Sequence, residues 1–214
     1  MTRDDALTNA DVASAYARWA PIYDLTFALV MRAGRRAAAS AASRSGGCVL
    51  DVGVGTGLEL PMFDRAVRLT GVDLSEPMLR RCQRRVRTGK LDHVHGLCVM
   101  DAMQLAFADA AFDVAVAPYV LTVVSDPART LDELVRVVRP GGEIVLVNHI
   151  GATSGPIAMA ESWLATRSAS LGWRPSFPWS IVQDWLTSRD DVALTERRAL
   201  PPWGLFTLIR LARL

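Results

Sequence analysis

Short apolar segments alternate with amphipathic helical segments over much of this 214-residue chain, and this alternation limits the fold more than any other feature of the sequence. Runs rich in β-branched residues, such as 48–52 and 112–117, are typical of strands buried on both faces. Strands that alternate with helices form β–α–β units, so we predict a doubly wound, mostly parallel α/β sheet. The expected strands are 48–52, 69–73, 94–100, 112–117 and 143–148, and the expected helices among them are 77–87 and 127–138.

Additional segments flank this core on both sides. Pro21 interrupts an N-terminal helical pattern, which predicts helices over about 10–19 and 22–44. After His149 the sequence becomes rich in tryptophan and proline, which favours an insertion of helices and loops. We therefore expect one domain made of four parts: N-terminal lid helices over 1–45, a ligand-binding core over 46–150, a helical lid insertion over 151–190, and terminal strands over 191–214 that include 206–211.

Charge and cysteine content exclude several classes of protein. The chain has 24 basic and 22 acidic residues, a net charge of +2, which gives no support to nucleic-acid wrapping. Cys48, Cys82 and Cys98 do not have the spacing of metal ligands, so we expect reduced thiols and no metal. The N-terminus has no apolar signal region, and no stretch approaches 18 uncharged apolar residues. These features predict a cytoplasmic location.

A glycine-rich loop follows the first expected strand and is the main functional signal. Gly53, Gly55 and Gly57 alternate with other residues directly after 48–52. Glycine tolerates unusual backbone angles and allows a ligand to approach the backbone closely. The pattern GxGxxG of dinucleotide-binding oxidoreductases is not met, because Leu58 and Leu60 occupy the positions of its last glycine.

Acidic residues at two further strand ends support a nucleoside ligand. Asp73 ends the second strand, where a carboxylate can accept two hydrogen bonds from a ribose diol. Asp101 follows the third strand, where it can accept from an exocyclic adenine amine, with Ala102 and Met103 beside the ring. Pro118 follows the fourth strand. All these positions lie at the carboxyl ends of strands, the edge at which open α/β sheets bind ligands.

The segments VLDVGVGTG, GVDLSEPML, DAMQLAFADAAFD and LVRVVRPGGEIVLVNH together resemble the class I S-adenosylmethionine-dependent methyltransferases over about residues 10–150. The resemblance implies a Rossmann-like fold, S-adenosyl-L-methionine as cofactor and S-adenosyl-L-homocysteine as product. It also implies that Asp51 orders the loop and approaches the methionine ammonium. The cofactor-binding residues that we expect are Tyr23, Asp51, Gly53, Gly55, Thr56, Gly57, Asp73, Leu74, Met78, Asp101, Ala102, Met103 and Pro118.

Three further segments bear on the methyl acceptor. The segment 16–24 resembles a lid motif of quinone and phospholipid methyltransferases. Together with 147–149 and 201–210, it resembles bacterial phospholipid N-methyltransferases. This resemblance implies phosphatidylethanolamine as acceptor, methylated stepwise towards phosphatidylcholine. The expected catalytic residues are Tyr16, Tyr119 and His149, which are able to relay a proton, and the tyrosines also suit a quaternary ammonium through cation–π contacts.

A phospholipid acceptor requires contact with a membrane. An apolar run over 25–31 is followed by basic residues, which suits an interfacial helix on anionic lipid, although an ordinary lid helix has the same pattern. A second basic tract, 80–90, is better explained as a solvated helix face. We expect peripheral association with the cytoplasmic face and no obligate protein partner. The residues expected at the substrate or the membrane are Arg18, Trp19, Arg32, Arg35 and Arg36.

Two alternatives to this interpretation remain open. One is a methyltransferase of a quinone or another small acceptor, and the second is a cofactor-binding module without turnover. Methylation of nucleic-acid amines is disfavoured, because Val116 and Ala117 stand before Pro118-Tyr119 in place of the acidic or amide residue of such enzymes.

Overall fold

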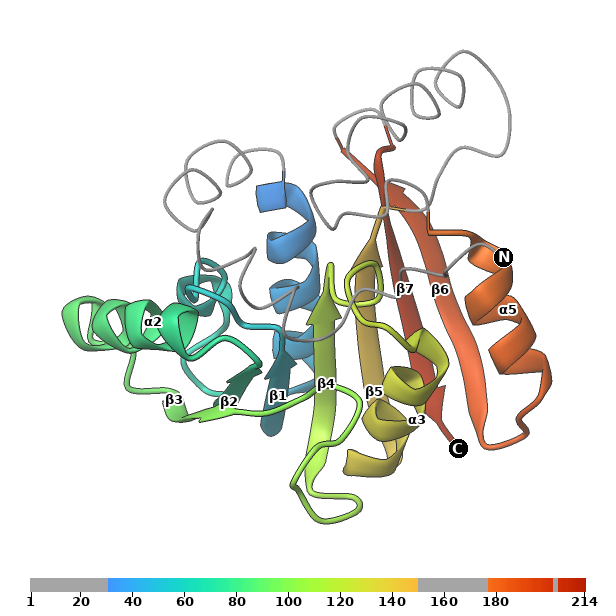
Figure 1. Cartoon of the computed structure of the whole chain (residues 1–214), viewed down its shortest axis with the longest axis horizontal. Coiled ribbons are helices and arrows are strands. Elements are labelled where there is room, and N and C mark those ends of the chain that lie inside the picture. Colours follow the sequence, from blue (N-terminus) through green and yellow to red (C-terminus); the bar gives the residue numbers. More distant parts are fainter. Residues whose placement is uncertain (1–30, 150–176, 202–203) are drawn as a thin grey trace, which may run out of the picture.

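The computed structural model describes residues 31–149, 177–201 and 204–214, and these residues form one seven-stranded sheet covered by helices (Figure 1). The strand order is β3-β2-β1-β4-β5-β7-β6, in which β7 is antiparallel to both of its neighbours and the other pairs are parallel. The strands are β1 Cys48–Val52, β2 Arg68–Asp73, β3 Val94–Val99, β4 Phe112–Pro118, β5 Val138–Asn148, β6 Val192–Leu200 and β7 Phe206–Arg213.

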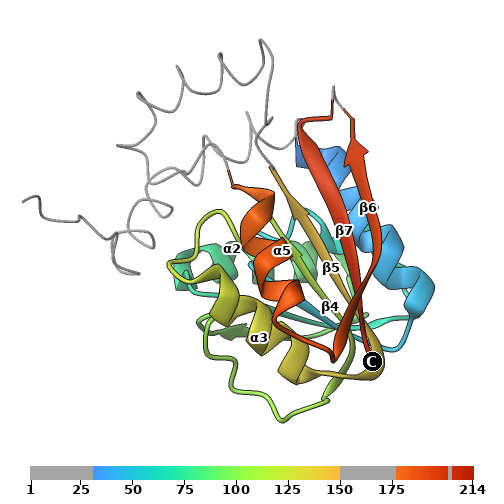
Figure 2. The ribbon, with the colours of Figure 1, turned by 90° about the vertical axis from the view of Figure 1, so that its right-hand side faces the viewer.

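Helices cover both faces of this sheet (Figure 2). The helix over residues 31–45 and α2, Glu76–Gly89, pack on one face through side chains such as Ala42 and Cys82. The other face carries α3, Pro127–Val137, and α5, Trp179–Thr187. A short 3-10 helix, η1 Leu60–Met62, follows the glycine-rich loop. The central strands are therefore buried on both sides, which explains their continuous apolar sequences.

The doubly wound, mostly parallel sheet predicted from the sequence is confirmed. Most strands begin and end within one residue of their expected limits. The fifth strand begins at Val138 rather than at Glu143, and the terminal segment, in which strands were expected, contributes, besides β7, the edge strand β6. Its polar residues leave it half exposed, as an edge strand should be, so its sequence lacks the apolar run of a buried strand. The helix expected over 10–19 and most of the 151–190 insertion lie outside the described residues.

The core depends on the leucines of the central strands. Leu146 in β5 is fully buried, and we expect Leu146→Ala to lower the free energy of unfolding by between about 2 and 5 kcal/mol through a cavity. Leu194→Ala on β6 is the matched control, because this side chain is 44% exposed. Denaturant unfolding measures both variants. Equal losses would contradict the described placement of these strands.

Candidate active site

The loop between β1 and η1 is built on glycines that no other residue can replace without strain. Gly53 and Gly57 both have φ of +75°. A β-carbon on Gly53 would lie 2.5 Å from a methyl group of Val120, and one on Gly57 would lie 2.6 Å from the thiol of Cys82. The loop thus packs closely against the segment after β4 on one side and against α2 on the other, which leaves its backbone facing a pocket.

The carboxylate of Asp73 connects this loop to the end of β2. Its Oδ2 accepts a hydrogen bond of 2.8 Å from the backbone N–H of Gly55, and its Oδ1 accepts one of 2.8 Å from the N–H of Ser75. Burial raises the pKa of Asp73, and these two backbone donors lower it. A carboxylate in this position still has lone pairs for a ribose diol, as the sequence predicts.

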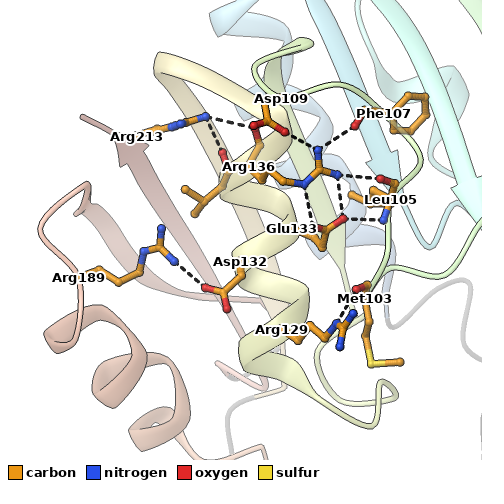
Figure 3. Close-up of polar contacts among 11 residues, drawn as sticks. Met103, Leu105, Phe107, Asp109, Arg129, Asp132, Glu133, Arg136, Arg189 and Arg213 are labelled. Carbon is orange, nitrogen blue, oxygen red and sulfur yellow. Dashed lines mark hydrogen bonds and ion pairs between the residues drawn. The ribbon is translucent and has the colours of Figure 1, made fainter.

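Charged side chains of α3 hold the segment after β3 in place (Figure 3). Arg136 donates to the carbonyls of Leu105 and Phe107, at 2.7 and 2.8 Å, and it forms ion pairs with Glu133 and Asp109. These bonds from Arg136 hold the pKa of Glu133 below its usual value.

The same helix reaches the residues expected to hold the adenine ring. Arg129 Nε donates to the carbonyl of Met103 at 3.0 Å, and Asp101 Oδ1 accepts from the Met103 N–H at 2.9 Å (Figure 3). The segment 101–109 is therefore fixed from two sides although it has little regular structure.

These elements surround one pocket at the carboxyl ends of β1, β2, β3 and β4. Of the thirteen expected cofactor residues, Asp51 lies behind the pocket, fully buried, Gly57 does not line it, and Tyr23 lies outside the described residues. The pocket thus brings together residues that are far apart in the sequence. The expected cofactor residues that line it are Gly53, Gly55, Thr56, Asp73, Leu74, Met78, Asp101, Ala102, Met103 and Pro118.

Tyr119 lines the same pocket in an unusual backbone conformation. Its φ is +66°, which is uncommon for an aromatic residue and is more often found where function requires it. Its hydroxyl donates a hydrogen bond of 2.9 Å to the carbonyl of Met31, and its ring packs edge-on against Phe206 at 5.1 Å. A β-carbon on Gly34 would lie 2.0 Å from the Tyr119 oxygen, so this glycine makes room for the hydroxyl.

His149 lies on the other side of Phe206, with ring centroids 6.1 Å apart. Its Nδ1 is 2.5 Å from the carbonyl oxygen of Leu205. Because a carbonyl only accepts, Nδ1 carries the proton, and in the neutral ring Nε2 is the acceptor nitrogen. The structure therefore brings two of the three expected catalytic residues to the ends of β4 and β5, on either side of one aromatic ring.

Two charged residues line the pocket in addition to the expected cofactor residues. Glu59 lines the pocket and is 4% exposed, and the signal for it was an acid between two leucines directly after the glycine-rich loop. Arg35, expected at the lipid or the membrane, is 8% exposed and lines the pocket as well. It lies on the inner face of the helix over 31–45, whereas Arg32 and Arg36 are exposed.

Several other expectations concern parts of the chain that the structure does not describe. Tyr16, Arg18, Trp19 and Tyr23 lie outside the described residues. Within the described ranges, no helix is long and apolar enough to cross a membrane. In the same ranges, no three His, Cys, Asp or Glu side chains converge as metal ligands would.

The fold and pocket define a class of protein. The sequence model of a family described as "Methyltransferase domain" matches residues 50–146. A solved S-adenosylmethionine-dependent methyltransferase of Thermotoga maritima, a possible histamine N-methyltransferase, covers 94% of this chain with a TM-score of 0.70 and 20% identity, and this chain covers 99% of it. The [4+2]-cyclase SpnF has the same fold, with a TM-score of 0.75, 18% identity and 97% coverage of both chains.

Curated relatives give the family. A phosphatidylethanolamine N-methyltransferase of Cereibacter sphaeroides is 41% identical over 94% of this chain and 97% of its own length. A demethylmenaquinone methyltransferase of Renibacterium salmoninarum is 34% identical over 68% of this chain and 62% of its own length. The chain belongs to the S-adenosylmethionine-dependent methyltransferase family, and it is an enzyme that uses this cofactor.

The pocket fits this cofactor on its own chemistry. Asp73 and Asp101 present carboxylates to a ribose and an adenine, Met103 and Ala102 offer apolar contacts to a ring, and buried carboxyl groups lie at the other end. Among the described residues, neither oxygen of Asp51 has a hydrogen-bond donor, which suits the ammonium group of the methionine end of the cofactor.

The bonds of Arg136 predict that a residue distant from the ligand controls cofactor affinity. Arg136→Ala should lower the free energy of unfolding by about 2 kcal/mol and weaken S-adenosylhomocysteine binding several-fold, because segment 101–109 loses its anchor. Arg80→Ala is the control, since Arg80 is 71% exposed and pairs only with Glu76 within the described residues. Chemical denaturation and calorimetric titration measure the two effects. Unchanged affinity in Arg136→Ala would show that this network does not position the cofactor loop.

Proposed function

We propose that this enzyme transfers methyl groups from S-adenosylmethionine to the amine of phosphatidylethanolamine, stepwise towards phosphatidylcholine, at the surface of an anionic membrane. The observation that carries this proposal is the similarity to the Cereibacter sphaeroides enzyme, which extends over 97% of that protein. Similarity to the quinone enzyme of Renibacterium salmoninarum covers 62% of that relative's length. The similarity to the Cereibacter sphaeroides enzyme thus extends beyond the cofactor-binding core.

The chemistry of an amine acceptor requires removal of a proton. An aminoethyl headgroup with a pKa of about 10.4 has on the order of one free amine in a thousand at neutral pH. The cofactor, when bound, would supply a methyl group on a sulfonium, so that attack by an amine lone pair on the methyl carbon would release S-adenosyl-L-homocysteine as the leaving group. The enzyme must then align the amine, exclude water and accept the ammonium proton.

Tyr119 and His149 are the described groups suited to this proton transfer. The Tyr119 hydroxyl donates to a backbone carbonyl, so its oxygen presents lone pairs rather than a proton to a cationic headgroup. The His149 ring is oriented by Leu205 such that Nε2 is its basic nitrogen. The ring faces of Tyr119 and Phe206 also favour the quaternary ammonium that forms as methyl groups accumulate.

Exposed arginines support contact with anionic lipid. Arg32 and Arg36 are exposed on the helix over 31–45. The apolar run 25–31 directly precedes them in the sequence. Guanidinium groups beside an apolar segment are attracted by anionic headgroups. We therefore place the enzyme peripherally on the cytoplasmic face of the membrane.

Vesicle assays test the acceptor directly. With radiolabelled S-adenosylmethionine and anionic vesicles that contain phosphatidylethanolamine, we expect label in the mono-, di- and trimethylated lipids separated by thin-layer chromatography. Vesicles of the same charge without phosphatidylethanolamine are the control and should remain unlabelled. Absence of labelled lipid from a preparation that binds S-adenosylhomocysteine would contradict the lipid acceptor and favour a quinone or another small acceptor.

Substitutions at the two proton-transfer candidates test the mechanism. Tyr119→Phe and His149→Ala should each lower kcat by at least about tenfold, within the range of general acid–base effects, and leave cofactor affinity within about threefold. Tyr119→Phe keeps the edge-on packing against Phe206 and loses only the hydroxyl. Steady-state kinetics and calorimetry separate the two quantities. Unchanged kcat in both variants would show that other groups carry the proton.

A further inference from the structure

The inner end of the cofactor pocket holds more acidic than basic groups. In the described part of the chain, the carboxyl groups of Asp51 from β1, Glu59 before η1 and Asp73 at the end of β2 lie near one guanidinium, that of Arg35. Asp51 is 0% exposed, Glu59 4% and Arg35 8%. Carboxylates removed from water in this way require a proton or a cation, because desolvation penalises an uncompensated charge.

The Asp51 and Glu59 carboxyl groups face each other within hydrogen-bonding reach. No described residue donates a hydrogen bond to either Asp51 oxygen. Two carboxylates therefore face each other as acceptors unless one of the pair is protonated. Burial, and then the charge and hydrogen bond of Glu59, raise the pKa of Asp51 well above its usual value. Burial raises the pKa of Glu59 to about 7, although Arg35 opposes this change.

Three other titratable groups among the described residues face this pair. Asp73 accepts two backbone hydrogen bonds, which oppose the rise in its pKa that burial causes. Cys82 on α2 is a neutral thiol, because burial and the charge of Asp51 raise its pKa to about 12. Arg35 attracts both carboxylates electrostatically. A proton that enters the cluster therefore binds the Asp51–Glu59 pair.

We propose that Asp51 and Glu59 share one proton in the empty pocket, and that the ammonium group at the methionine end of S-adenosylmethionine displaces this proton when the cofactor binds. Glu59, which lines the pocket, contacts the ammonium directly, and Asp51 lies behind it. The proton leaves to solvent, and the ammonium takes over the compensation of the two carboxylates. This inference rests on the cofactor and not on the lipid acceptor.

Arg35 would bind the other charged group of the amino-acid end of the cofactor, its carboxylate. Within the described residues, the guanidinium of Arg35 donates one weak hydrogen bond, of 3.8 Å, to the sulfur of Met31. Its guanidinium lines the same pocket as Glu59 and matches the carboxylate of the methionine end. The ammonium and carboxylate of one ligand thus meet Glu59 and Arg35 respectively.

Displacement of a proton by the cofactor makes the cofactor affinity depend on pH in one direction. Below the pKa at which the pair loses its shared proton, the proton competes with the ammonium, so cofactor affinity should fall as the pH falls through that value, by up to tenfold per pH unit. Above that pH the pair is ionised, the competition ends and the affinity should level off. Each molecule bound near pH 6 should release about one proton from the pair.

Calorimetric titration with S-adenosylhomocysteine measures this proton, because the product carries the same amino-acid end and does not react. Heats of binding at pH 6 in buffers of different ionisation enthalpy give the number of protons released. We expect about one for the wild type and close to zero for Glu59→Gln, with affinity of the variant reduced about tenfold at pH 7.5. Glu76→Gln, at an exposed position on α2, should match the wild type.

Analogues of the ligand test the proposal on the wild-type protein, so misfolding of a variant cannot affect the result. An S-adenosylhomocysteine analogue without the α-amino group should bind the wild type without proton release, and one without the carboxylate should still release the proton. Proton release by the deaminated analogue, release that persists in Glu59→Gln, or binding of S-adenosylhomocysteine to the wild type without release would each overturn the proposal. The measurement contains no lipid, so a failed lipid assay and a failed proton count are separate results.

Discussion

The two backbone hydrogen bonds to Asp73 are the constraint on which the pocket depends. They tie the glycine-rich loop after β1 to the start of α2, and they fix both segments relative to β2. The loop cannot relax from this position, because Gly53 and Gly57 lie against Val120 and Cys82. A buried carboxylate that is satisfied by backbone donors is costly to remove, so the same residue that can bind the ribose also maintains the shape of the pocket.

The two ends of the pocket are built differently. At the adenine end, segment 101–109 has little regular structure and is held in place by Arg129 and Arg136 of α3 (Figure 3). At the methionine end, the groups belong to a rigid strand, a tight loop and a helix, and their charges are buried. The first end offers hydrogen bonds and apolar contacts to a neutral ring. The second offers charge compensation to a zwitterion, for which a buried site is more selective.

Much of the fold and of the cofactor pocket could be predicted from the sequence, because the responsible features are local. Strand periodicity, the alternating glycines and acids at strand ends are visible in windows of a few residues, and they place Asp73 and Asp101 at one edge of the sheet. Glu59 and Arg35 could not be predicted in this way. Their roles depend on which face of a loop or a helix is buried, and Arg35 has the same local sequence context as the exposed Arg36.

The same limit applies to the edge strand β6, to the polar network of α3 and to the aromatic group at the ends of β4, β5 and β7. Tyr119 and His149 were expected near the site, but their common neighbour Phe206 belongs to a strand that is antiparallel and distant in the sequence. Pairings of this kind require the topology of the sheet. The identity of the methyl acceptor is harder still to predict from the sequence, because catalysis and recognition combine residues from several parts of the chain.

A crystal structure of the protein with sinefungin, an unreactive analogue of the cofactor, tests the central claim most directly. We expect the ribose hydroxyls to lie on Asp73, the adenine beside Asp101 and Met103, and the amino-acid end between Glu59 and Arg35. An analogue bound in the opposite orientation, or with its amino group remote from Glu59, would contradict it.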